Sequence, residues 1–181
     1  MELVSIDHDD RRGRRVNSSR TLADRFRTQR TDRIRVDGIE VVSMTEVEIG
    51  ADSILEVLVE DSRPDIEQSL RILSKTGGDI SVVGTDFEPS ESVLVLAETY
   101  PAFELEFCDL DDDETGVLQL WNSWILGDGE HAWIGNSGIV VETLPVPEGA
   151  SDRIRLWCSD GLGDPDFDDL VLLLTVGPKG A

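Results

Sequence analysis

The sequence is short of lysine. Two of its 181 residues are lysine (Lys75 and Lys179), whereas 38 are acidic, and the formal net charge is −22. Lysine adds an apolar stem to a surface, while short carboxylates hold water and cations, so this imbalance is typical of proteins that work in molar salt. Salt at that level shortens the screening length to about 3 Å, which makes crowded carboxylates tolerable. An ordinary acidic protein is the alternative, and the lysine deficit favours the halophilic interpretation.

Cysteine and long apolar runs are also scarce. Cys108 and Cys158 are too few for a disulfide framework, so we expect two buried thiols, with a single bridge as the alternative. No stretch approaches the roughly 20 apolar residues that a membrane span needs. The first residues lack the hydrophobic core of a signal peptide, so we do not expect Sec-type secretion.

Residues that mark catalysis are missing too. The two histidines are His8 and His131. The sequence contains no nucleophile elbow, no H-E-x-x-H and no glycine-rich phosphate loop. An enzyme is identified by its site rather than by its fold, and the sequence shows no such site. We therefore expect neither an enzymatic activity nor a cofactor.

What the sequence does have is charge sorted by position. Residues 1–35 hold ten arginines and six acids, a net of +4, whereas residues 36–181 hold six basic groups and 32 acids, a net of −26. We therefore divide the chain into a basic arm over 1–35, a body over 36–177 and a tail over 178–181. A body of this charge repels itself unless salt screens it.

The arm is expected to mediate assembly. Its arginine cluster is too charged to pack in a core. A short helix is expected over 19–30, with Ser19 as its cap and Leu22 and Phe26 on one face. The candidate assembly residues are Arg11, Arg12, Arg14, Arg15, Leu22 and Phe26. Such an arm suits nucleic acid, lipid headgroups or the acidic body of a neighbouring subunit. Because molar salt leaves only direct contact pairs, we favour neighbouring subunits, with a lipid surface second.

The body is predicted to be all-β, a β-sandwich or barrel whose leading form is a single jelly roll. Alternating apolar residues such as Phe103, Leu105 and Phe107 indicate strands with one buried face. Strands are expected near 39–49, 53–60, 80–84, 91–98, 102–108, 117–126, 132–135, 139–144, 153–158 and 170–176. Over 64–74, Pro64 and the spacing of Ile66, Leu70 and Leu73 slightly favour a helix over a strand.

Two acidic loops are weak candidates for Ca²⁺, which prefers oxygen ligands. The first contains Asp109, Asp111 and Asp113, but it departs from an EF-hand loop because its glycine falls too late and Leu120 takes the place of the bidentate glutamate. The second contains Asp164, Asp166 and Asp168 and resembles a D-x-D-F-x-D-L/V stretch of some secreted calcium-binding β-sandwich domains. In so acidic a chain, solvated loop carboxylates are the favoured interpretation.

The tryptophans are expected in the core or at a subunit interface, where this residue is enriched. Trp121 and Trp124 are the interface candidates. They are three residues apart and so point to opposite faces of a strand. One is therefore expected in the core and the other at an interface.

The basic arm, the acidic β body and the halophilic composition together resemble the smaller major capsid protein of icosahedral, membrane-containing haloarchaeal viruses. The resemblance is to the whole chain and to no diagnostic motif. It implies a capsid subunit in the virion, assembled in the cytoplasm of a halophilic host. It also implies contacts with further copies, a second capsid protein and the internal membrane surface, without sequence-specific nucleic acid. The alternative is a haloarchaeal calcium-stabilised β-sandwich binding module.

Overall fold

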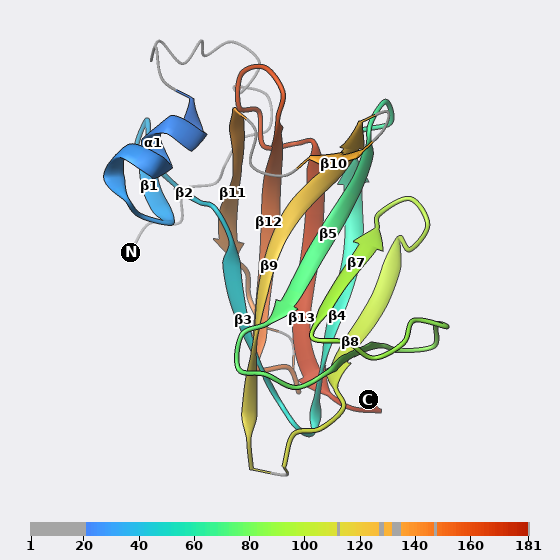
Figure 1. Ribbon diagram of the computed structural model, residues 1–181. Helices are drawn as coiled ribbons and strands as arrows, with labels where there is room; N and C mark the ends of the chain where they lie inside the picture. The colour runs from blue at the N-terminus through green and yellow to red at the C-terminus, as the bar shows by residue number, and fades with distance from the viewer. Residues whose placement is uncertain (1–20, 112, 127–128, 132–134, 147, 181) are drawn as a thin grey trace.

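The computed structural model describes residues 21–111, 113–126, 129–131, 135–146 and 148–180. The described part is all-β apart from one short helix, as the sequence predicted (Figure 1). Its elements are α1 (Leu22–Gln29), β1 (Arg33–Val36), β2 (Ile39–Val42), β3 (Thr45–Gly50), β4 (Ser53–Ser62), β5 (Glu67–Ser74), β6 (Ile80–Val82), β7 (Ser92–Leu96), β8 (Ala102–Phe107), β9 (Thr115–Leu126), β10 (Gly129–His131), β11 (Asn136–Thr143), β12 (Asp152–Gly161) and β13 (Leu170–Pro178).

The strands form two antiparallel sheets that face each other as a β-sandwich (Figure 1). The eight-stranded sheet has the order β1-β2-β11-β12-β13-β4-β8-β6. The second sheet has the order β10-β9-β5-β7, and β3 also pairs with β9. Several neighbours are distant in sequence, notably β4 with β13 and β5 with β9, so the sheets depend on long-range pairing.

The main core lies between the sheets and follows the alternation of each strand. On β12, for example, Ile154, Leu156 and Cys158 point inward and are buried, whereas Arg153 and Arg155 point outward. Burial of one face every second residue is what a half-buried strand requires.

A smaller core holds α1 on the outer face of the eight-stranded sheet. Leu22 and Phe26 are buried there against Ile34, Val41 and Val140. Their common face was predicted, but the helix is shorter than 19–30 and its cap is Thr21, whose Oγ1 accepts a hydrogen bond from the Asp24 amide at 3.2 Å. The two apolar side chains therefore belong to the chain's own core, and residues 21–35 join the body.

Three local predictions need correction. The helix expected over 64–74 was wrong, because β5 lies there as an inner strand between β7 and β9. The strand expected over 39–49 is two strands, since the chain crosses from one sheet to the other between Val42 and Thr45. Of 132–135, only Gly135 is described, and it lies in a turn.

The two cysteines differ in burial. Both thiols are free, and Cys158 is buried while Cys108 is exposed. The expectation of two buried thiols was therefore wrong for Cys108, because its strand β8 ends at Phe107 and the residue sits in the following bend.

Candidate functional site

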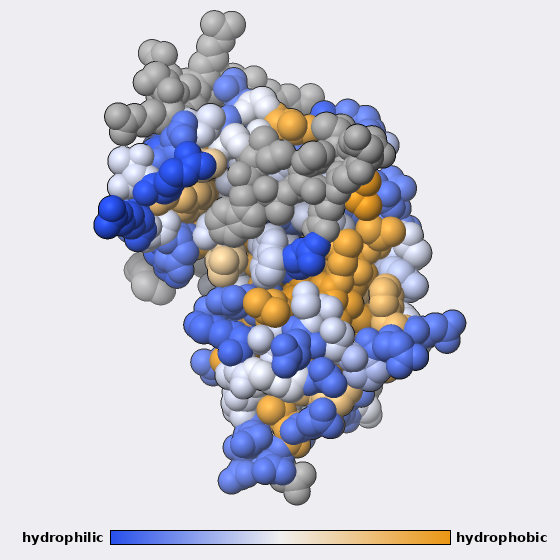
Figure 2. Space-filling view, viewed as in Figure 1, coloured by the Kyte–Doolittle hydropathy of each residue, from blue (hydrophilic) through white to orange (hydrophobic). Residues whose placement is uncertain are grey.

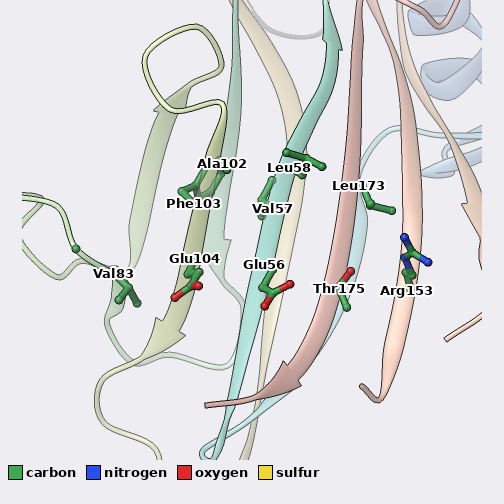
Figure 3. A pocket seen from close by; sticks show the side chains of 11 residues that line it. Glu56, Val57, Leu58, Val83, Ala102, Phe103, Glu104, Arg153, Leu173 and Thr175 are labelled. Carbon is green, nitrogen blue, oxygen red and sulfur yellow. The ribbon is translucent and has the colours of Figure 1, made fainter. Parts of the chain in front are cut away.

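A shallow groove lies on the outer face of the eight-stranded sheet, with a volume of about 750 Å³. It runs across β8, β4, β13 and β12, and Val83 and Gly84, which follow β6, close one end (Figure 3). The lining residues are Glu56, Val57, Leu58, Val83, Gly84, Ala102, Phe103, Glu104, Arg153, Leu173 and Thr175.

Two carboxylates stand side by side in this groove. Glu56 of β4 and Glu104 of β8 are direct partners in the sheet register, and Figure 3 shows them in one row with Thr175 and Arg153. Like charges directly opposite each other destabilise a strand pair. Within the described residues neither glutamate has an ion-pair partner, and Arg153 is separated from Glu56 by the intervening strand β13.

Arg155, in the next row of side chains on this face, is already paired with other carboxylates. Arg155 donates to Glu60 at 2.5 and 3.2 Å and to Glu142 at 3.1 Å, and these contacts raise its pKa. Arg155 is therefore occupied by Glu60 and Glu142, and within the described part of the chain it forms no ion pair with Glu56 or Glu104.

The groove is apolar beside its carboxylates. Leu58 is 45% exposed, and it is the register partner of Leu173 and Ala102 on the two adjacent strands. Val83 is 38% exposed at the edge. A ligand that suits this surface has positive charge and apolar surface next to each other.

A second polar site is buried at the end of the sandwich where β12 ends. Arg63 Nη1 lies 3.0 Å from Asp160 Oδ2 and 3.3 Å from Asp169 Oδ1. The side chains of these two aspartates are 0% and 5% exposed. The rest of the guanidinium holds the exposed Asp65 in a two-point contact at 2.5 and 2.9 Å. Buried carboxylates need such a partner because removal from water penalises their charge.

The loop between β12 and β13 is attached to this cluster. Asp169 Oδ2 accepts from the Asp160 amide at 2.7 Å, and its side chain hydrogen-bonds that of Asp166. Burial, together with the nearby Asp166 and Asp160, raises the pKa of Asp169 to about 7. A proton shared between two carboxyl groups therefore helps to hold the loop at neutral pH.

The second sheet contributes neutral polar groups to the same interior. Gln68 Nε2 donates to Asp160 Oδ2 at 3.4 Å, and Asn122 Nδ2 donates to the Ser159 carbonyl at 3.0 Å. Gln68 Oε1 and Trp124 Nε1 are buried without a hydrogen-bond partner among the described residues. This end of the sandwich is therefore a polar layer between two apolar sheets.

The predicted calcium residues are not brought together. Asp164, Asp166 and Asp168 are exposed, as are Asp109, Asp111 and Asp113, although residue 112 lies outside the described part. Within the described ranges, no three His, Cys, Asp or Glu side chains are placed to share a metal ion. The residues that do converge are Asp160, Asp169 and Arg63, which the sequence interpretation missed. Of the six predicted calcium residues, Asp166 meets this cluster, through its contact with Asp169. Arg63 and Asp160 are 97 residues apart, and no short motif links them.

The other residues that the sequence singled out are four arginines of the arm and two tryptophans. Arg11, Arg12, Arg14 and Arg15 lie outside the described residues. Trp124 is fully buried between the sheets and so belongs to the core. Trp121 is half-buried on the second sheet, in one row with Arg71 and Leu94, and it packs against the main core. Figure 2 shows an apolar area on the face of this sheet. The expected interface role of Trp121 stays a prediction.

No family model, curated protein or solved structure matches this chain. In the part that the structure describes, no helix is long and apolar enough to span a bilayer.

Proposed function

We propose that this protein is a structural subunit that assembles with further copies of itself in molar salt. Its specific form is a capsid subunit of a halophilic archaeal virus, located in the virion over an internal membrane. The observation that carries the proposal is the sorting of charge: residues 11–20 hold five arginines and no acid, whereas residues 36–181 have a net charge of −26. A cationic segment and an acidic body on one chain are complementary between copies.

The sandwich body supports this proposal. Its eight-stranded sheet offers an acidic and apolar outer surface that its own described cations leave unpaired at Glu56 and Glu104. The jelly roll stays a prediction: the long-range pairs β4–β13 and β5–β9 suit it, whereas the β11–β12–β13 meander is not one of its features. Contacts with a second capsid protein and with lipid belong to the same proposal.

The proposal is tested by light scattering of the full chain in molar KCl. We expect oligomers or larger assemblies, and we expect a chain that lacks residues 1–20 to stay monomeric with an unchanged far-UV circular dichroism spectrum. The calcium-binding alternative predicts a monomer whose stability rises with added Ca²⁺. A full chain that remains monomeric at every concentration in molar salt overturns the assembly function.

A further inference from the structure

The groove and helix α1 lie on the same face of the molecule. Val140 of β11 packs against α1 on the outer face of the sheet. Its register partner on β12 is Trp157, whose own partner on β13 is Val171, so all three residues lie on this face. Leu173 lies two residues after Val171 and therefore points to the same side. The outer sheet face is thus covered by α1 at one end and open at the groove.

The groove has the chemistry to bind guanidinium groups. Glu56 and Glu104 are adjacent and unpaired within the described residues, and the planar fork of arginine binds carboxylates through two hydrogen bonds. In molar salt such contacts persist only at touching distance. Burial beside Leu58 and Leu173 strengthens them, because water is excluded there.

The chain itself carries a segment with this chemistry. Residues 11–16 read Arg-Arg-Gly-Arg-Arg-Val, which gives four positive charges and one apolar side chain in six residues. Six extended residues span about 20 Å. Five strands from β6 to β12 span roughly the same distance, since neighbouring strands lie about 4.8 Å apart.

We propose that residues 11–16 of one copy lie in the groove of a neighbouring copy, with arginines on Glu56 and Glu104. This inference rests on the proposed assembly function and names its contact surface.

The geometry favours a neighbouring copy over the same chain. The start of α1 is fixed near the end of β12, because the Leu22 amide donates to Asn136, whose register partner is Gly161. Arg153, in the groove, lies eight residues before Gly161 on β12, and Glu56 lies level with it two strands away on β4. Glu56 is therefore about 29 Å from Gly161. The backbone from Thr21 reaches at most about 25 Å by Arg14. The segment as a whole therefore cannot occupy its own groove.

The first test neutralises the groove. The Glu56→Gln/Glu104→Gln variant is expected to raise the concentration at which assembly is half complete about tenfold in molar KCl. The matched control is Glu48→Gln/Glu98→Gln, which removes two exposed carboxylates outside the groove and makes the same change in net charge. We expect this control to assemble like the unaltered chain. Equal behaviour of the two double variants overturns the inference.

The second test locates the arm directly. In a Cys108→Ser background, chains that carry Arg14→Cys are mixed with chains that carry Leu58→Cys and are oxidised in molar salt. A mixed disulfide dimer is expected, and Arg14→Cys mixed with Glu48→Cys serves as the control. Since each chain has one exposed thiol, the mixed bond forms only between copies.

The outcomes separate this inference from the proposed function. Assembly without the mixed disulfide, or with equal bonding to residue 48, places the arm elsewhere and refutes the groove while leaving the assembly function intact. A chain with both Arg14→Cys and Leu58→Cys that closes only on itself also refutes it. If deletion of residues 1–20 leaves assembly unchanged, the arm is not the occupant.

Discussion

Arg63 should be worth far more to stability than its position near the surface suggests. Its Nη1 is the shared partner of the buried Asp160 and Asp169, at 3.0 and 3.3 Å. Replacing it in Arg63→Met keeps an apolar stem of similar length but leaves two carboxylates buried without a cation. Breaking a buried pair in this way costs about 3 to 5 kcal/mol. In a domain of this size that loss lowers the melting temperature by roughly 10 °C.

The matched control is Asp65→Asn, which removes the exposed partner of the same guanidinium. Asp65 is 63% exposed and Arg63 lowers its pKa, but an exposed ion pair contributes little to stability because water and salt screen it. Both variants are measured by denaturant unfolding in molar KCl. The cost of Arg63→Met should be larger at pH 8 than at pH 5.5, because Asp169 can take up a proton at the lower pH.

A double-mutant cycle makes the result decisive. Adding Asp160→Asn to Arg63→Met should recover part of the lost stability, since the uncompensated charge is then gone. The reasoning is refuted if Arg63→Met and Asp65→Asn cost the same, or if the cost of Arg63→Met does not change with pH.

Three further results are expected. The folded pKa of Asp169, about 7, exceeds its unfolded value of about 3.9. The free energy of unfolding should therefore fall as the pH rises from 4 to 7 and then level off. The variant Asp169→Asn should flatten this slope, and its free energy of unfolding at pH 8 should rise by at most about 4 kcal/mol. Asp168→Asn, an exposed neighbour, should keep the slope, and an equal slope in both variants would contradict the assignment. Gly138→Ala would put a Cβ 2.7 Å from Val41 Cγ1, so it should cost about 1 to 3 kcal/mol by forcing α1 and β2 outward. Gly177→Ala on β13, with open space around its Cβ, should change stability by no more than about 0.5 kcal/mol. Finally, dilution from molar to millimolar salt should lower the melting temperature, and an unchanged circular dichroism melt would remove the halophilic premise.

The strands were predictable wherever alternation was strong. Phe103, Leu105 and Phe107 of β8 are buried, as their spacing indicated. The spacing of Ile66, Leu70 and Leu73 misled because it is helical, whereas the strand buries Leu70 and Ile72 and turns Leu73 to the other face. Pairing of β5 with β9 and β7 on its two sides decided the outcome, and no local pattern carries that information.

The site was less predictable than the fold. Acid-rich loops attract attention in a sequence, but Asp164 and Asp168 are exposed, whereas Asp160 at the end of β12 is fully buried. What distinguishes Asp160 is its contact with Arg63, and that contact depends on which strands meet at the end of the sandwich. The groove has the same origin, because Glu56 and Glu104 face each other only through the register of β4 and β8.

Salt places a constraint on how such a protein can recognise its own copies. At 0.1 M salt the screening length is about 10 Å, so the acidic bodies repel one another before their surfaces meet. In molar salt that repulsion is confined to about 3 Å, and so is every attraction between arm and body. Long-range steering is then absent, and selection among surfaces must come from groups that touch. A paired carboxylate site beside exposed leucine provides such groups, whereas the solvated aspartates of the loops do not. This difference is why the groove, rather than the most acidic segment of the chain, is the surface on which we place the arm.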